Sequence, residues 1–315
     1  MKSPIVLCLI FFSSVVYAVT NKSKSNEEIV NKALPTKEVI ENPTLKTLSG
    51  GLNKYSLYSS FTYRGGSLSD PVSALRPNIQ KAQETVGLSN MSGNFGVKYR
   101  ASKQDNLSFQ VGLYSTTPFH SSLDTKDSKI QKDFDENHKN LDADDPTLRY
   151  FRPSYIGNIQ NITFIKYQYV TRGIYRDYGL RSAIALSHAA AYKINKAAYI
   201  AASLTYENYH YDRSSTKYMG HDISLLPYQT QHKFRGNISA EFYLKRNISL
   251  RFITDVYSAY RMKEQSKIQK RVLQQTLATT YFFSRDISIA PNIRFIAKDI
   301  RTKRTNVGLT LNVNL

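Results

Sequence analysis

Cysteine is almost absent from this chain of 315 residues, and tryptophan is wholly absent. The one cysteine, Cys8, lies in an apolar run near the N-terminus. If that run is removed, no thiol remains, which excludes disulfide bonds, a cysteine nucleophile and cysteine-ligated metal sites. After residue 18, no stretch approaches the ~20 apolar residues that a transmembrane helix needs, so a helical membrane protein is excluded.

The N-terminal run has the three parts of a secretory signal peptide. Met1–Ser3 carries a positive charge, Pro4–Val16 is apolar, and Val16 and Ala18 stand at the positions that a signal peptidase reads. The pattern predicts export, with residues 1–18 cleaved away. The alternative is a retained membrane anchor, but the run is short for an anchor and no basic stop-transfer segment follows it.

Residues 19–52 are polar and show no sustained hydrophobic period. This composition predicts a periplasmic tail or linker, with one short helix near residues 26–34. The rest of the chain, residues 53–315, has a regular pattern and is predicted to be one domain.

Acidic residues are also scarce: the chain has 24 of them and 43 lysines and arginines, so its net charge is +19. Loss of Lys2 with the signal would leave +18. Such a balance first suggests a nucleic-acid partner, but export argues against one inside the cell. The partners that we expect are anionic and extracytoplasmic: lipid phosphates, small anionic solutes, acidic sugars or imported DNA.

From Lys54 onward the hydrophobic period is two, which is the period of a β-strand with one apolar face. The C-terminal end shows it best, because Val307, Leu309, Leu311, Val313 and Leu315 alternate with polar residues and glycine. The same alternation predicts eleven strands near residues 54–64, 90–102, 106–115, 161–171, 181–192, 197–209, 232–244, 248–257, 272–283, 287–297 and 305–315.

The connections between these strands alternate in length. Short turns are predicted at Ser102–Asn106, Lys193–Lys196, Lys245–Asn247 and Ser284–Asp286, and long connections at Gly65–Leu88, Ser115–Thr147, Asp212–Gln231, Ser258–Arg271 and Lys298–Arg304. An even strand number and consistent sidedness require a twelfth strand at Leu148–Ile156 that turns at Gly157–Asn161, although it contains Pro153. A soluble β-sandwich is the alternative, since alternation by itself does not distinguish the two.

The signal peptide, the hairpins with long loops and the terminal strand together resemble Gram-negative outer-membrane proteins as a class. The resemblance implies an all-β transmembrane barrel of about twelve strands, with short periplasmic turns, long extracellular loops and both ends periplasmic. It also implies that residues 305–315 act as the signal for the outer-membrane assembly machinery, although the class usually ends in an aromatic residue and this chain ends in Leu315. A monomer is expected, among lipid and lipopolysaccharide. The basic loops after residue 258 would either form a solvated charged surface, which we prefer, or pair with lipopolysaccharide phosphates.

The polar face of the strands carries the functional signal. Alternation predicts a basic lumen, which favours anions in a narrow pore. Glu241 is expected opposite Arg251 as a direct ion pair, and Asn237 opposite Asp255. The predicted pore-lining and anion-binding residues are Lys98, Arg100, Lys166, Arg172, Lys233, Arg235, Arg251 and Arg294.

The segment Ser115–Thr147 is acidic within this basic protein. We expect it either to fold inward and narrow the pore, by analogy with general porins, or to remain a solvated surface loop. Its candidate constriction residues are Asp133, Asp135, Glu136, Asp142, Asp144 and Asp145.

Motifs for catalysis, metals or cofactors are not found. The cluster of His210, His221 and His232 in one long connection fits no ligand spacing, and alternation places His188 on the lipid side, which suggests a bulge or a register error. The sequence therefore predicts a non-enzymatic channel for small anionic or polar solutes, without metal, cofactor or nucleic acid. A plugged barrel that acts in adhesion through its loops, or a lipid hydrolase, are the alternatives.

Overall fold

The computed structural model describes residues 42–49, 51–79, 86–138, 141–218, 221–265 and 267–315. The chain divides into two compact units, Met1–Glu38 and Val39–Leu315, and all described residues belong to the second. The expected signal peptide and the expected helix near residues 26–34 lie outside the described residues.

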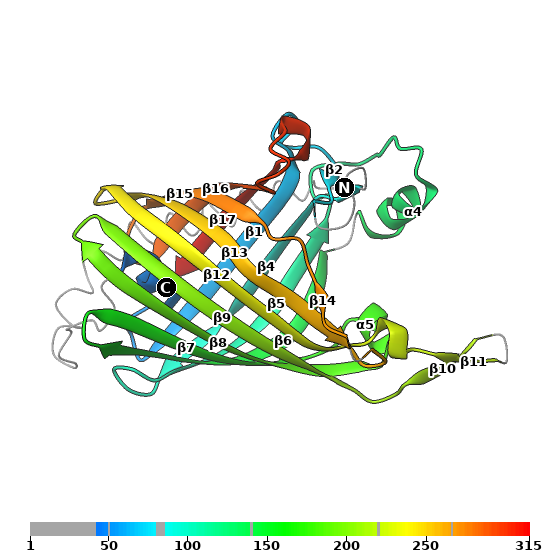
Figure 1. The fold of residues 1–315 in the computed structure, drawn as a ribbon, viewed down its shortest axis with the longest axis horizontal. Helices are drawn as coiled ribbons and strands as arrows, with labels where there is room; N and C mark the ends of the chain where they lie inside the picture. Colours follow the sequence, from blue (N-terminus) through cyan, green and yellow to red (C-terminus); the bar gives the residue numbers. More distant parts are fainter. Residues whose placement is uncertain (1–41, 50, 80–85, 139–140, 219–220, 266) are drawn as a thin grey trace. The chain divides into compact units, whose positions relative to one another are not determined.

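Twelve long antiparallel strands close into a barrel, as predicted (Figure 1). Each strand pairs with its neighbours in the chain, and the first pairs with the last, so the sheet has no free edge. The strands are β1 (Tyr55–Ser67), β4 (Asn90–Arg100), β5 (Asn106–Thr116), β6 (Leu141–Ile156), β7 (Ile159–Tyr169), β8 (Leu180–Asn195), β9 (Ala198–Tyr211), β12 (Thr230–Lys245), β13 (Ile248–Met262), β15 (Gln275–Phe282), β16 (Ile287–Phe295) and β17 (Asn306–Asn314).

The two ends of the barrel differ. All five turns between hairpin strands lie at one end, the short-turn end, together with both ends of the described chain. The connections at the other end, the long-loop end, carry short elements of their own. These are β2 (Leu75–Pro77), β3 (Val86–Leu88), α4 (Ser128–Asn137), α5 (Gly173–Asp177), β10 (Ser215–Tyr218), β11 (His221–Ser224), η1 (Leu226–Tyr228), β14 (Gln269–Lys270) and η2 (Thr302–Arg304).

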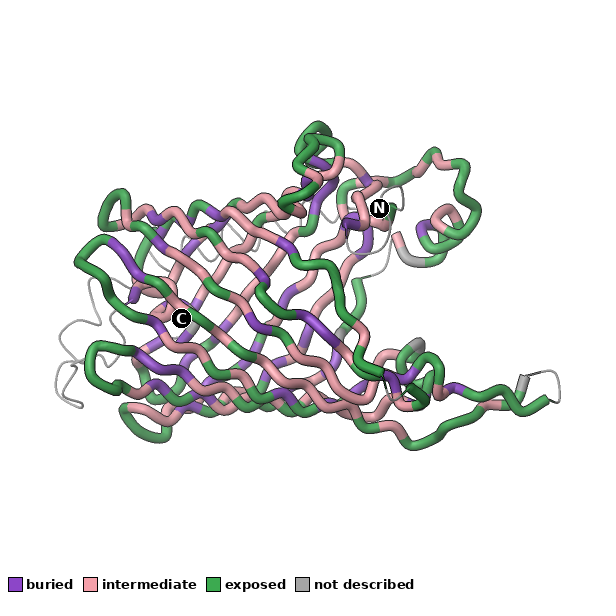
Figure 2. Tube along the Cα trace, viewed as in Figure 1, coloured by how far each residue is buried: buried purple, intermediate pink, exposed green. Residues whose placement is uncertain are grey.

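The barrel wall is apolar outside and polar inside. Leu204 and Phe109, for example, are 58% and 55% exposed on the outer face, and Figure 2 shows burial changing from residue to residue along the strands. An apolar belt of this extent is unfavourable in water and suits lipid. No helix within the described ranges is long and apolar enough to cross a membrane.

Two prolines fit the wall because each sits where a ladder bond is missing. Pro153 lies past Phe151, where pairing with β5 ends and β6 keeps only β7 as a neighbour. Pro291 pairs with Leu309 on β17 but lies in a gap of the pairing with β15. A proline cannot donate a ladder hydrogen bond, so both positions tolerate it. The predicted twelfth strand is confirmed, and it begins earlier than expected.

His188 needs no bulge. The pairing of β8 with β9 runs without a shift from Ser182 to Lys193, so the bulge or register error expected near His188 is absent from this described stretch. The imidazole faces outward beside Thr163, whose Oγ1 lies 3.1 Å from its Nδ1. The alternation was correct at this position, and the polar ring belongs to the lipid face.

Candidate functional site

The lumen-facing side chains follow the predicted register closely. Glu241 pairs across the ladder with Arg251, and Asn237 with Asp255, as expected. The ion pair expected between Glu241 and Arg251 does not form. Glu241 instead accepts a hydrogen bond of 2.8 Å from Ser249 and two more from residues before and in the helix α3 (Pro43–Ser49).

Two of the predicted anion-binding residues bind the chain itself. The ammonium of Lys98 donates to the carbonyl oxygens of Ser49 and Gly51, the second at 2.8 Å. A guanidinium nitrogen of Arg100 lies 3.2 Å from the carbonyl oxygen of Leu52. These contacts place residues 43–49, 51 and 52, which were expected in the tail, inside the lumen at the short-turn end. Alternation gave the correct face for both side chains, but it could not reveal what shares the lumen with them.

A paired group of charges lies on the wall formed by β7, β9 and β12. Lys233 donates to Glu207 at 2.7 Å, and Tyr209 donates to the same carboxylate oxygen at 2.5 Å. Lys166 donates to the side-chain oxygen of Gln168 at 3.1 Å. These predicted cations do face the lumen, but Glu207 offsets part of their charge.

Other arginines on the inner wall have no acidic partner. Within the described residues, the side chains of Arg64, Arg251 and Arg294 make no hydrogen bond or ion pair. Arg64 lies opposite Gly308 and Arg294 lies opposite Asn306, so the two flank β17 on its inward face. This places two unneutralised guanidinium groups near the long-loop end of the lumen.

Arg76, from the connection between β1 and β4, joins this group. Its charge interacts with those of Arg294 and Arg64, and the charge of Arg294 also interacts with that of Arg235. We call Arg64, Arg76, Arg235 and Arg294 the arginine cluster. Its acidic contact is Asp255, which forms a 3.0 Å ion pair with Arg235. Among the described residues, four guanidinium groups therefore face one carboxylate, which leaves a strongly positive region.

The pKa of Arg76 reflects its burial and the nearby positive charges. Burial, followed by the charges of Arg294 and Arg64, lowers the pKa of Arg76 to about 10. The residue stays cationic at neutral pH, but its Nε is buried without a hydrogen-bond partner among the described residues. Like charges that are held together without counterions repel one another, and an anion that binds between them lowers this repulsion.

Sequence reasoning missed two members of the arginine cluster. Arg64 continues the inward series of β1, so the alternation carried a signal for it. Arg76 lies in a connection without any hydrophobic period, and no sequence pattern pointed to it. Arg172, predicted on the wall, lies after β7 at the N-cap of α5, where its guanidinium stacks 4.7 Å from the ring centre of Tyr114.

The six acids predicted to form a constriction are not brought together. Asp133, Asp135 and Glu136 are exposed on α4, and Asp142 is exposed on β6. Asp145 is buried and accepts hydrogen bonds from the backbone of Thr171 at 2.6 Å and from Gln168 at 2.7 Å. The sixth acid, Asp144, lies on β6, and its side chain is outside the described structure.

The histidines show no catalytic arrangement in the described part of the chain. There, none is hydrogen-bonded to a serine or a carboxylate, and no group of three or more histidine, cysteine, aspartate or glutamate residues could hold a metal ion. His232, for example, contacts the hydroxyl of Tyr206 at 2.8 Å.

Comparison with known proteins places the fold. No family model and no curated protein matches the sequence. Among solved structures, the COG4313 outer membrane channel from Pseudomonas putida F1 matches with a TM-score of 0.52 at 8% identity, over 90% of this chain and 100% of that one. The NanC porin gives a TM-score of 0.44 at 8% identity over 82% and 98% of the two chains. The OmpF of Salmonella typhi in complex with daunomycin gives 0.38 at 9% identity over 84% and 98%. The chain thus has the closed, twelve-stranded β-barrel fold of a Gram-negative outer-membrane channel.

Proposed function

We propose that this protein is an outer-membrane channel that passes small anionic solutes, with the arginine cluster as its selective region. The observation that carries the proposal is the charge balance of the cluster: four guanidinium groups against the carboxylate of Asp255. In a lumen enclosed by a low-dielectric wall, such a balance concentrates anions and repels cations.

Guanidinium groups also favour a particular kind of anion. Each presents planar, paired N–H donors that match a carboxylate or a phosphate group. Arg64 and Arg294 both have such donors available, because neither is engaged by the described residues around it. We therefore expect carboxylated or phosphorylated small solutes to pass more readily than halide ions of similar charge.

The test is the ion selectivity of single channels in a planar bilayer under a salt gradient. The wild type should prefer anions, and Arg294→Gln should reduce the anion-to-cation permeability ratio about fivefold, since one charge ~4 Å away in water contributes about 1 kcal/mol. Arg246→Gln, in the exposed turn between β12 and β13, removes an equal charge away from the cluster and should leave the ratio unchanged. Equal effects of the two substitutions would refute the assignment.

One observation favours the alternative of a plugged barrel that acts through its loops. The helix α3 and the residues after it take up part of the lumen at the short-turn end. The same recordings separate the two functions, because a barrel without a conducting path would show no current steps although it is folded.

A further inference from the structure

Helix α3 bridges walls that are diametrically opposite. Lys98 lies on β4 and Glu241 on β12, and the strand order separates these two strands by six steps in either direction around the barrel. Both side chains nevertheless bind the same short segment, Glu241 before and within its first turn and Lys98 at its end. The segment therefore crosses the lumen instead of following one wall.

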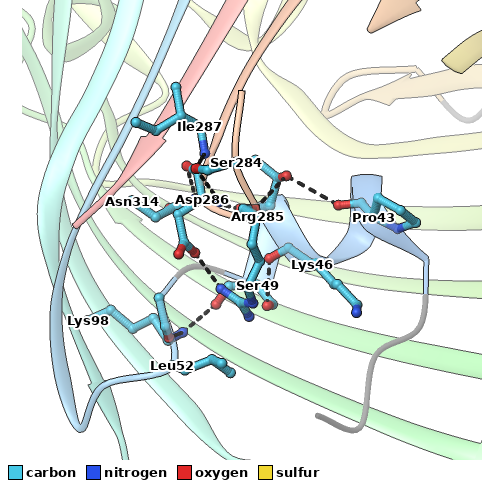
Figure 3. A network of polar contacts seen from close by, with 12 residues as sticks. Pro43, Lys46, Ser49, Leu52, Lys98, Ser284, Arg285, Asp286, Ile287 and Asn314 are labelled. Atoms are coloured by element: carbon cyan, nitrogen blue, oxygen red, sulfur yellow. Dashed lines mark hydrogen bonds and ion pairs between the residues drawn. The ribbon is translucent and has the colours of Figure 1, made fainter. Parts of the chain in front are cut away.

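The C-terminal end of the segment is held by a set of polar contacts with the barrel wall (Figure 3). Lys98, 5% exposed, donates to the carbonyl oxygens of Ser49 and Gly51. Asn314, near the C-terminus, donates to the carbonyl oxygen of Thr47 at 2.8 Å. The hydroxyl of Thr47 in turn donates to the carbonyl oxygen of Arg285 at 3.2 Å. These contacts satisfy carbonyl groups that a helix end leaves without intrahelical partners.

The N-terminal end of the segment is held by a buried acidic side chain of the wall. Glu241, 6% exposed, accepts hydrogen bonds from the side chains of Asn42 at 3.1 Å and Thr44 at 2.5 Å. A buried carboxylate without such donors is costly, and Arg251 across the ladder does not supply them. The wall thus carries an acid whose partners come mainly from the segment.

The middle is held by apolar contact. Phe151 and Ile162 are buried on the inner face of β6 and β7, and Leu45 and Phe164 pack against them. An apolar patch inside an otherwise polar lumen would face water if the segment left. Polar contacts at both ends and an apolar contact between them make a site that matches this segment along its length.

We propose that residues 42–49, 51 and 52 form a plug, bound in cis to a peptide-binding site built into the barrel wall, and that release of this plug widens the conducting path. The site consists of Glu241, Lys98 and Asn314 with the apolar patch of Phe151, Ile162 and Phe164. The binding of the plug rests on the contacts within the fold, whereas its effect on the conducting path rests on the proposed channel function.

Thiol labelling tests whether the plug is seated, and it needs no channel activity. The mature chain should lack cysteine, so Leu45→Cys provides a single reporter. Its thiol should react with a membrane-impermeant reagent at least about tenfold more slowly than that of Lys196→Cys in an exposed turn. Adding Thr44→Val, which removes a hydrogen bond to Glu241, should speed the reaction. Equal rates for L45C and K196C would overturn the proposal.

Conductance tests whether the plug limits the pore. Leu45→Asp places a charge against the apolar patch and leaves the wall unaltered, so it should increase the single-channel step. A synthetic peptide of residues 42–52, added on the short-turn side, should restore the smaller step, and a scrambled peptide should not. A step unchanged by L45D would overturn the gating role. Absence of steps in both proteins would instead refute the channel function, and the labelling result would still decide whether the plug is bound.

Discussion

Because adjacent residues of a strand face opposite sides of the barrel wall, a charge introduced at one of them should destabilise the fold much more than the same charge at the other. Leu204 lies in the middle of β9, 58% exposed, between His188 and Gly236 on the outer face. Ser203 faces the lumen and lies between Ala189 and Asn237 on the neighbouring strands. Arginine at Leu204 would enter lipid, whereas arginine at Ser203 would enter a polar interior.

The size of the destabilisation depends on how deep in the bilayer the substituted residue lies. An arginine on the lipid face costs about 2–4 kcal/mol near the bilayer midplane and about 0–1 kcal/mol near the interfaces. Because Leu204 is central in its strand, Leu204→Arg should lower the free energy of unfolding by about 2–4 kcal/mol. Ser203→Arg should lower it by less than ~1 kcal/mol, because its guanidinium stays hydrated.

The assay is urea unfolding of the protein folded into phosphatidylcholine bilayers, followed by tyrosine fluorescence and gel mobility. The wild type and both variants would be compared in the same lipid. If S203R were as destabilising as L204R, or more so, the assignment of inner and outer faces on β9 would be refuted.

Two further predictions concern a turn and the lipid face. In the turn between β4 and β5, a 2.5 Å hydrogen bond from Tyr150 holds the pKa of Asp105 below its ordinary value. The contribution of Asp105 to stability is therefore present above the ordinary aspartate pKa and is lost as pH falls through the lowered folded pKa. Tyr150→Phe should move the Asp105 pKa back toward its ordinary value in an NMR titration, and an unmoved pKa would show that the hydrogen bond is not its cause. His188→Leu should raise the free energy of unfolding in bilayers by up to about 1 kcal/mol, since it removes a polar ring from lipid. A stability equal to or lower than that of the wild type would contradict this placement.

Much of the wall was predictable because alternation is a local property. The alternation along a strand determines which of its residues face outward, and the hairpin turn at Lys245–Asn247 determines that Glu241 pairs with Arg251. Even the weak strand containing Pro153 followed from the need for an even strand count. The same local pattern placed His188 outward, and that placement was correct although it was chemically unexpected.

The lumen's contents were not predictable in the same way. Alternation assigns a face, but what a side chain meets there depends on segments far away in the sequence. Glu241 meets Asn42 and Thr44 instead of Arg251, and Lys98 meets the end of α3 instead of a solute. Arg76 enters the arginine cluster from a connection without periodicity. Each case is a long-range contact that no local pattern encodes.

The measurement that most directly tests the central claim is solute entry into liposomes that contain the full-length protein. Glucose, gluconate and glucosamine are similar in size and differ mainly in charge, so swelling rates in isosmotic solutions of each report charge preference alone. The account predicts that gluconate enters fastest and glucosamine slowest in the wild type, and that all three solutes enter faster in L45D. Equal rates for the three solutes, or fastest entry of glucosamine, would contradict an anion-preferring lumen.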